Sequence, residues 1–393
     1  MKQPKKPALR FKGFVNDWEQ RKLGDIVDFL DTQRKPLTEN IREKGPYPYY
    51  GASGIVDYVA GYIFDEELVL LSEDGANITD RNYPVCFLAS GKYWVNNHAH
   101  VLKTKEGIDN NFICNSLECK DFSIYNTGMA MPKLNQDICK KIPVDFPTYD
   151  EQEKIGNYFR NIDYFITLHQ RKLEKLQNLK KAMLEKMFPK NGAKVPEIRF
   201  KGFTDDWEQR KLGEMAEIIG GGTPNTNNKS YWNGDINWYA PAEIVNQIYV
   251  NSSERKITEE GYNNSSAKML PTGTVLFTSR AGIGKTAILA KEGCTNQGFQ
   301  SIVPHKKELD SYFIFSRTEE LKNYGEKMGA GSTFVEVSGK QMENMNLMMP
   351  KTIAEQQKIG TYFENIDNLI TLHQRKLEKL QNLKKAMLEK MFI

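Results

Sequence analysis

The sequence predicts a mixed α/β protein in which two different bodies are carried by two long helices, related by an approximate two-fold axis. Residues Ile166–Phe188 recur without a single change as Ile370–Phe392. A second repeat begins each half, Arg10–Gly24 matching Arg199–Gly213, whereas the segments in between have little in common. A repeat of about 200 residues has the size of a domain, so the chain is a tandem duplication and not a solenoid.

Composition is that of an ordinary globular protein. The 393 residues suffice for two to three domains, with 39% hydrophobic and 26% charged residues. No run of about 18 apolar residues and no signal peptide is present, so we expect no membrane association. The five cysteines form no CxxC pair, and their odd number does not suit a disulfide framework. We therefore expect a reduced, cytoplasmic protein.

Positive charge is concentrated in the repeated segment near each helix end. The chain has a formal net charge of +4, and each 23-residue copy holds six basic and two acidic residues. The two copies together carry +8, which leaves −4 for the remainder of the chain. The variable bodies are therefore not broadly basic, and charge alone would not hold nucleic acid on them.

The segment from Gln152 to Phe188 predicts one long helix. It contains no proline and only Gly156, and its apolar residues recur mostly three or four positions apart. Thr148 or Asp150 would provide the N-cap. The second copy is framed in the same way, and a helix of 37 residues would be roughly 55 Å long.

The apolar stripe of each helix must be buried, and its duplicate is the obvious partner. We expect an antiparallel coiled coil with one body near each end. The alternative is a pair of unrelated surface helices, each packed on its own domain. The residues expected at the helix–helix interface are Ile166, Leu173, Leu176, Met183, Ile370, Leu377, Leu380 and Met387.

Both bodies are predicted to contain short strands followed by helical stretches at Asn110–Glu118 and Ser311–Tyr324. The expected strands of the first body are Leu68–Leu71, Val85–Leu88, Tyr93–Val95 and Ala99–Leu102. Those of the second body are Ile236–Tyr239, Thr274–Thr278, Ala287–Ala290 and Ser301–Val303.

Loops between these strands are rich in amide, hydroxyl, glycine and aromatic residues, as in YPYYGASG at Tyr47, GGGTPNTNNKSYW at Gly220 and TNQGFQS at Thr295. Amide groups can read base edges, and glycines let a backbone approach closely, although ordinary surface loops are the simpler alternative. Candidate DNA-binding residues in the first body are Tyr50, Ser53, Lys92, Asn96, Asn97, His98, Met131 and Lys133. Those in the second body are Thr223, Asn225, Lys229, Ser279, Arg280, Lys285, Asn296, Gln297, Gln300, Ser332 and Thr333.

The string SRAGIGKTAI at Ser279 looks like a phosphate-binding loop. That loop requires a glycine five residues before the Gly-Lys pair, and Ser279 stands at this position. We therefore expect no nucleotide site. Arg280 and Lys285 on this turn would equally suit DNA phosphates.

Other signatures of catalysis and metal binding are missing from the sequence. His98 and His100 alternate on an expected strand and would face one side, but no nearby Cys or third His completes a metal site, so a hydrogen-bonding pair is the better interpretation. The sequence contains no HExxH, GxSxG or dinucleotide fingerprint. We expect no catalytic residues and no metal site in this chain.

The order of these features resembles the specificity subunit of type I restriction–modification enzymes. The resemblance covers nearly the whole chain. It rests on GGTP at Gly221, WYAPAEI at Trp238, FTSRAGIG at Phe277, TNQGFQSIVP at Thr295, GSTFVEVSG at Gly331, MAMPKLNQDICKKIPVDFP at Met129 and EQEKIGNYFRNID at Glu151.

The resemblance implies two target recognition domains, residues 1–150 and 190–350, each reading one half of a bipartite, asymmetric sequence in double-stranded DNA. Residues 151–189 and 351–393 would be the spacer helices, which set the gap and dock two modification subunits. Restriction subunits with translocase activity would join outside them. The resemblance implies no cofactor in this chain, because S-adenosylmethionine, ATP and Mg²⁺ would belong to the partner subunits.

Two alternatives remain open from the sequence. The chain could be a coiled-coil scaffold whose bodies bind proteins, which retention on duplex DNA would test. It could also be a standalone ATPase, although Ser279 weakens that interpretation.

Overall fold

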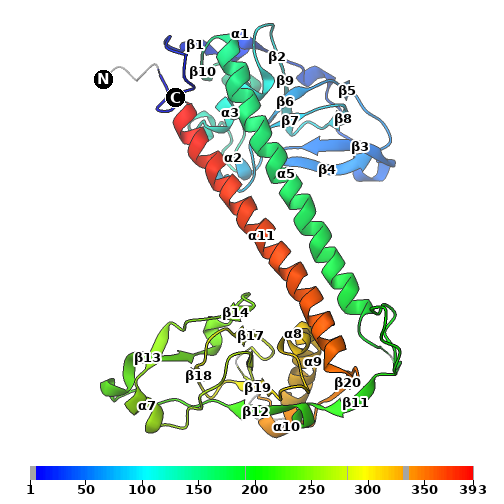
Figure 1. The fold of residues 1–393 in the computed structure, drawn as a ribbon. Helices are drawn as coiled ribbons and strands as arrows, with labels where there is room; N and C mark the ends of the chain where they lie inside the picture. The colour runs from blue at the N-terminus through cyan, green and yellow to red at the C-terminus, as the bar shows by residue number, and fades with distance from the viewer. Residues whose placement is uncertain (1–5, 191, 281, 331–335, 393) are drawn as a thin grey trace. The chain divides into compact units, whose positions relative to one another are not determined.

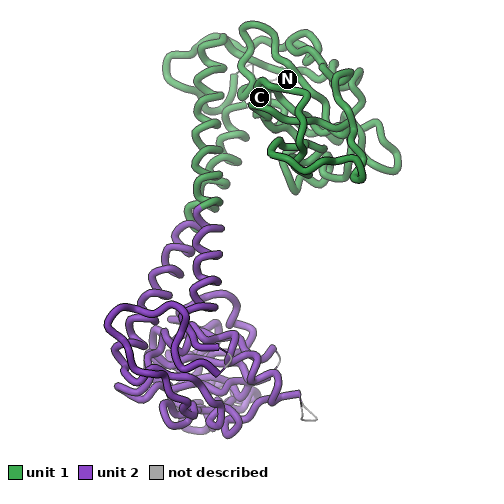
Figure 2. Tube along the Cα trace, turned by 90° about the vertical axis from the view of Figure 1, so that its right-hand side faces the viewer, with its two compact units in different colours: residues 1–171, 374–393 green, residues 172–373 purple. Residues whose placement is uncertain are grey.

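The computed structural model describes residues 6–190, 192–280, 282–330 and 336–392. The chain forms two compact units, residues 1–171 with 374–393, and residues 172–373 (Figure 2). Each unit holds one mixed α/β body, the first part of one long helix and the last part of the other (Figure 1). The predicted fold class is therefore confirmed.

The two long helices are α5 (Tyr149–Lys186) and α11 (Ile353–Met391). The Thr352 hydroxyl accepts a hydrogen bond from the Glu355 amide at 3.3 Å, which satisfies one of the free donors of the first turn. No helix among the described residues has the length and apolar character needed to cross a membrane.

The first body contains two four-stranded sheets, ordered β2-β9-β6-β7 and β4-β3-β8-β5, and the small pair β1-β10. Its strands are β1 (Glu19–Lys22), β2 (Val27–Phe29), β3 (Lys44–Gly51), β4 (Gly54–Val59), β5 (Phe64–Asp65), β6 (Leu68–Ser72), β7 (Cys86–Ala89), β8 (Lys92–Val95), β9 (Ala99–Thr104) and β10 (Pro143–Phe146). Its helices are α1 (Leu23–Ile26), α2 (Asn77–Asp80), α3 (Asn110–Glu118) and α4 (Gln136–Cys139).

The second body has sheets ordered β12-β19-β16-β17-β14 and β15-β13-β18, and the pair β11-β20. Its strands are β11 (Glu208–Lys211), β12 (Ala216–Gly220), β13 (Trp232–Tyr239), β14 (Tyr249–Val250), β15 (Arg255–Ile257), β16 (Val275–Phe277), β17 (Thr286–Leu289), β18 (Cys294–Thr295), β19 (Gln300–Pro304) and β20 (Asn346–Met349). Its helices are α6 (Leu212–Met215), α7 (Glu259–Asn263), α8 (Ser311–Ser316), α9 (Thr318–Gly329) and α10 (Gly339–Glu343).

Two local expectations need correction. The segment from Tyr47, expected as a loop, lies in β3, because Gly51 pairs with Gly54 and leaves only a two-residue turn between β3 and β4. The helical stretch at Ser311–Tyr324 is two helices separated at Arg317, which is buried and donates to the Met348 carbonyl at 2.7 Å. The helix expected at Asn110–Glu118 has those bounds in α3.

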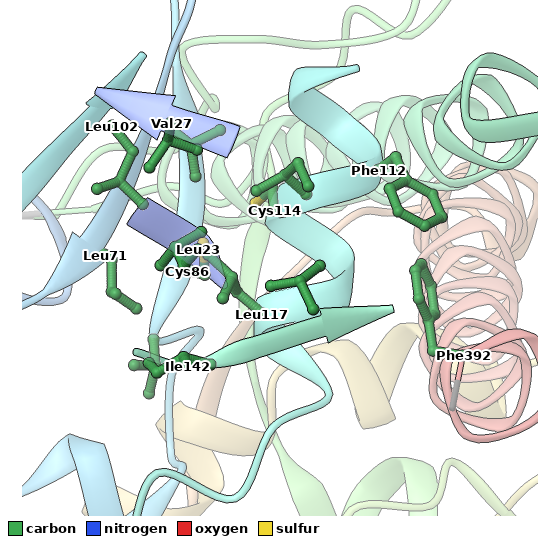
Figure 3. Packing of buried hydrophobic residues seen from close by; sticks show 14 of the residues in the cluster. Leu23, Val27, Leu71, Cys86, Leu102, Phe112, Cys114, Leu117, Ile142 and Phe392 are labelled. Atoms are coloured by element: carbon green, nitrogen blue, oxygen red, sulfur yellow. The ribbon is translucent and has the colours of Figure 1, made fainter. Parts of the chain in front are cut away.

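The core of the first unit uses residues from both ends of the chain. Figure 3 shows Phe392, from the end of α11, beside Phe112 of α3, and their ring centroids are 5.3 Å apart. The second unit repeats this packing with Phe188, which lies 5.6 Å from Phe313 and 6.1 Å from Trp207. Phe188 and Phe392 are equivalent positions of the repeat. The end of α11 therefore covers the core of the first body, and the end of α5 covers the core of the second body.

One buried ion pair attaches each body to the start of its long helix. Arg10 makes two hydrogen bonds to Glu151, at 2.6 and 2.7 Å, and the Glu151 side chain is 0% exposed. Arg199 binds Glu355 in the same way, at 2.7 and 2.9 Å. A buried carboxylate is tolerated only with such a partner, so the repeated Arg10–Gly24 segment holds the joint closed.

A glycine lets each body approach its helix closely. Asp109 caps α3 by accepting from the Phe112 amide at 2.7 Å, and a Cβ placed on Gly156 would lie only 2.2 Å from the same carboxylate. Gly360 and Asp310 repeat the arrangement, with a separation of 2.5 Å. The only glycine of the predicted helix is therefore required by packing.

The helix segments within each unit run antiparallel and share one type of ion pair. Lys384 binds Asp163 at 2.7 Å in the first unit, and Lys180 binds Asp367 at 2.6 Å in the second. These residues are equivalent positions of the repeat, 204 residues apart. All eight residues expected at the interface are partly buried, and Ile166, Met387 and Met183 pack against the body cores. Contact between the leucines of the two helices stays a prediction.

Candidate nucleic-acid interface

In the first body a short turn follows the parallel strands β3 and β8. Tyr50 pairs with Val95, and the amide of Asn96 donates to the Tyr50 carbonyl at 3.0 Å. The Asn96 side-chain oxygen accepts from the His98 amide at 2.8 Å, which closes an Asx turn. Asn96 is buried, so its amide shapes the turn, whereas Asn97 and His98 are exposed on it.

The second body has the same turn at the same place. Tyr239 pairs with Thr295 in the parallel strands β13 and β18, and the Asn296 amide donates to the Tyr239 carbonyl at 3.0 Å. Asn296 accepts from the Gly298 amide at 2.7 Å, and this turn exposes Gln297. Two dissimilar sequences therefore form the same Asx turn. We name it the reading turn, residues 96–98 in the first body and 296–298 in the second.

Beside each reading turn lies the segment that follows one strand of a neighbouring sheet, which is β6 in the first body and β16 in the second. In the first body the Glu73 amide donates to His98 O at 2.9 Å, and Asp74 forms a backbone bridge with Lys133. In the second body the Ser279 amide donates to Gly298 O at 2.8 Å, and Arg280 bridges Glu336. By these hydrogen bonds Asp74 is equivalent to Arg280, and Lys133 to Glu336.

A network of charged side chains supports the reading turn of the first body. His100 Nδ1 lies 2.7 Å from Asp31 Oδ2, and Arg34 Nη1 lies 2.7 Å from Glu73 Oε2. Burial is the largest single influence and opposes protonation of His100. Hydrogen bonds to Asp31 and Cys139 and the negative charge of Asp31 together outweigh it and raise the pKa of His100 to about 10. His100 is therefore an imidazolium at neutral pH.

Candidate metal-ligand atoms of Asp31, Glu73 and His100 lie within 4.8 Å of one another. Arg34 contacts both carboxylates of this cluster, at 3.5 Å for Asp31 and 2.7 Å for Glu73, so cationic side chains already neutralise them. His98 contacts a different carboxylate, Asp74, at 2.8 Å. The two histidines are thus hydrogen-bonded separately and do not form one pair.

The equivalent place in the second body is uncharged. Gly220 pairs with Gln300 where Asp31 contacts His100, and Ser279 replaces Glu73. The Ser279 hydroxyl is buried and has no hydrogen-bond partner among the described residues. Thr223 donates to the side-chain oxygen of Gln297, which ties the loop after β12 to the reading turn.

The described residues of the phosphate-loop-like string belong to a β-hairpin, and Ala281 lies outside them. The string joins the antiparallel strands β16 and β17, and the Gly284 amide donates to Thr278 O at 3.0 Å. A phosphate-binding loop leads from a strand into a helix whose N-terminus faces the phosphates, and no helix follows here. Lys285 is exposed on this hairpin.

The structure brings only part of the candidate residues together. Lys92 lies at the opposite end of β8 from the reading turn and contacts the Tyr62 ring at 4.7 Å. Tyr50 is half-buried against Phe87, and Ser279 is fully buried, so neither presents its side chain freely to DNA. Besides Lys92, the exposed candidates are Ser53, Asn97, His98, Met131, Asn225, Lys229, Lys285 and Gln297, and Ser332 and Thr333 lie outside the described residues.

Sequence reasoning missed Asp74 and Glu336, and the supporting residues Asp31, Arg34 and Glu73. They are acidic or basic residues without a motif, and they come from segments far apart along the chain. The signals that pointed to the region were the His98/His100 alternation and the amide-rich loop at Thr295.

Two mixed α/β bodies that present the same turn with different side chains define a two-module recognition protein. A family model described as "Type I restriction modification DNA specificity domain" matches residues 15–178 and 204–382. The chain belongs to this family and contains two copies of its domain.

Curated relatives are specificity subunits. The chain is 36% identical over 191 residues to the type I restriction enzyme MjaIX specificity subunit of Methanocaldococcus jannaschii, which covers 48% of this chain and 44% of the relative. It is 28% identical over 240 residues to the EcoR124I/EcoR124II specificity subunit of Escherichia coli, 58% of this chain and 56% of the relative. The chain thus matches about half the length of these relatives. The MjaVIII specificity subunit of M. jannaschii aligns over 95% of this chain and 91% of its own length at 21% identity.

Solved structures support the fold. The S subunit of a type I restriction–modification system from M. genitalium matches with a TM-score of 0.73 at 14% identity, over 99% of both chains. A chain from a structure on complex assembly and conformational transition of the type I R-M system matches with a TM-score of 0.50 at 17% identity, over 97% of this chain and 99% of that chain.

Proposed function

We propose that this chain is the non-catalytic specificity subunit of a type I restriction–modification complex. Each body reads one half of a bipartite, asymmetric sequence in double-stranded DNA. The observation that carries the proposal is the duplicated reading turn, in which equal backbone geometry presents Asn97 and His98 in one body and Gln297 in the other. Base edges are distinguished by such donor and acceptor groups, while a common backbone fixes their position.

A groove beside each body supports docking of two copies of one partner. The first groove, about 880 Å³, has a helix wall that includes Asp163, Ile166, Lys384 and Leu388. The second groove, about 920 Å³, has the equivalent Asp367, Ile370, Lys180 and Leu184. The helix walls therefore repeat, because each of these residues has its counterpart 204 positions away.

The opposite walls come from the bodies and differ, with Cys114 and Glu118 in the first groove and Ser316 and Glu320 in the second. A partner that docks twice must use what the grooves share, which is the helix wall. We assign this wall to two modification subunits, with restriction and translocase subunits outside them. S-adenosylmethionine, ATP and Mg²⁺ would be bound by those partners, in the cytoplasm where the complex meets chromosomal DNA.

This division of labour fits the charge distribution. The chain outside the two 23-residue copies carries a net −4, so partners would supply much of the contact to DNA phosphates. The paired helices would then set the gap between half-sites. Two bodies on one face of DNA favour half-sites about one helical turn apart, roughly 34 Å between centres.

Methylome sequencing of cells with and without this chain tests the proposal directly. We expect one bipartite motif to be methylated only when the chain is present. Replacing Asp25–Tyr149 with the equivalent body of another family member should change one half of that motif and keep the other half and the gap. A change in both halves would show that the bodies do not read independently. The absence of any motif, with the chain held on proteins and not on duplex DNA, would favour a protein-binding scaffold.

A further inference from the structure

The position shared by Asp74 and Arg280 reverses its charge between the bodies. Each residue follows the strand next to the reading turn and forms a backbone bridge with the segment ahead of a short helix. The residue across that bridge also reverses, from Lys133 to Glu336. At this position an equal backbone therefore carries opposite charges in the two bodies.

Arg280 is held next to the reading turn of the second body. Its side chain is 38% exposed, and Nη1 lies 4.0 Å from Glu336 Oε2. A Cβ placed on Gly298 would lie 3.6 Å from Arg280 Nε, so the glycine leaves room for the guanidinium against the turn. The Glu336 carboxylate is close enough to attract the guanidinium without forming a hydrogen bond, so the N–H groups of Arg280 stay available to a ligand.

We propose that Arg280 reads a guanine in the half-site of the second body, with Glu336 as its positioning residue. The inference rests on the proposed DNA-reading function. Arginine donates two parallel hydrogen bonds to guanine O6 and N7 in the major groove, and this fork matches guanine better than any other base. Gln297 on the adjoining turn is exposed and would offer a further amide group to the same part of the half-site.

The first body presents the opposite chemistry at this position. Asp74 can only accept hydrogen bonds when ionised, and both of its oxygens lie within 2.9 Å of His98 Nδ1. An acceptor at the same position suits a base that offers an amino group, such as cytosine N4, and repels guanine O6. The two half-sites should therefore differ at the base pair that this position contacts.

The test uses the complex reconstituted with its modification subunits, with single-base-resolved methylation of a randomised target library as readout. Arg280→Ala should remove discrimination at one G·C pair of the second half-site, on the order of tenfold to a hundredfold. The first half-site and the gap should stay unchanged. Arg280→Lys should restore only part of the discrimination, because an ammonium cannot make the parallel fork.

Glu336→Gln should weaken discrimination at that same base pair less than Arg280→Ala does, since the guanidinium remains but loses its restraint. Arg210→Ala is the matched control, because Arg210 also pairs with a glutamate of this body, Glu308 at 2.7 Å, away from the reading turn. It should leave the motif unchanged. Thermal melting of each variant identifies any loss of folding, and Arg280→Gln then serves as the milder replacement.

Three outcomes would overturn the inference. The wild-type second half-site could lack a G·C pair, or Arg280→Ala could keep full discrimination. A uniform loss of methylation at every base pair would instead assign Arg280 to phosphate. Each leaves a bipartite wild-type motif in place, so the proposed function would stand. The absence of a bipartite motif in the wild type would reject the proposed function itself.

Discussion

The two bodies share a backbone at the reading turn and differ in what lies beneath it. The first body supports the turn with charges, His100 and Arg34 against Asp31 and Glu73. The second body places the uncharged Gln300 opposite Gly220 at the same position, and the neutral Thr223 donates to Gln297 of the turn. The Asx turn needs only Asn96 or Asn296 and the end of a parallel strand pair. Its geometry is therefore independent of the side chains beneath it, and these can diverge while the presenting surface keeps its place.

Removing the arginine of the joint to the long helix should destabilise both bodies, and the second body less, because Trp207 also donates to Glu355 at 3.3 Å. Arg10→Ala and Arg199→Ala each leave a buried carboxylate without its ionic partner, which costs about 3–5 kcal/mol of unfolding free energy. Hydrogen exchange resolved by peptide should show loss of protection in the first body for one variant and in the second body for the other. Arg21→Ala, which removes an exposed pair with Glu19, is the control and should change nothing measurable. An undisturbed first body in Arg10→Ala would show that this ion pair does not hold the joint.

Exchanging the equivalent residues His100 and Gln300, which lie beneath the turn, should affect the stability of the two bodies differently. His100→Gln removes the imidazolium that pairs with Asp31, and we expect a loss of about 2–3 kcal/mol confined to the first body. Gln300→His should cost less, since Gly220 offers no carboxylate and the imidazole would stay neutral. Peptide-resolved hydrogen exchange of both variants measures the difference. Equal losses in the two bodies would mean that the charged network adds no stability.

Because only the first body has His100 at this position, the stability of the first body alone should depend on pH through this residue. The folded-state pKa of His100 is raised to about 10, above its usual value near 6.5. The stabilisation is therefore complete below about pH 6.5 and declines as the pH rises towards 10, by at most about 1.4 kcal/mol per pH unit. The stability difference between wild type and His100→Gln should narrow over this range. A difference that stays constant would show that His100 is neutral in the folded protein.

The smallest expected effect belongs to Lys285, which is exposed on the hairpin of the second body. If it contacts a DNA phosphate, Lys285→Ala should lower the slope of log affinity against log salt by roughly 0.9 and leave the methylated motif unchanged. Salt-titrated DNA binding measures the slope. Calorimetry with ATP on the same preparation tests the competing role, and loss of ATP binding in the variant would restore the nucleotide interpretation.

Features that depend on periodicity or repetition were predictable from the sequence. The long helix and α3 follow from apolar spacing and end signals, and the two-body architecture follows from the repeats. The strand at Tyr50 was missed because Tyr-Pro-Tyr-Tyr-Gly resembles a loop in composition, whereas its pairing with β8 joins residues far apart in the chain. The match between Asp74 and Arg280 could not be predicted, since it exists only through backbone hydrogen bonds to His98 and Gly298 in different sequence surroundings.

The presence of Met391 and Phe392 in the core of the first body has a consequence for the order of folding. Residues up to Arg171 leave the ribosome long before α11 does, yet their core includes the side chains at the end of that helix. The core of the first body therefore stays incomplete, with Phe112 and Trp18 uncovered, until Phe392 has been translated. Contacts this distant along the chain slow folding and leave apolar surface open to chaperones or to aggregation in the meantime. Deleting Met391 and Phe392 would therefore destabilise the N-terminal body, although the deleted residues lie near residue 393.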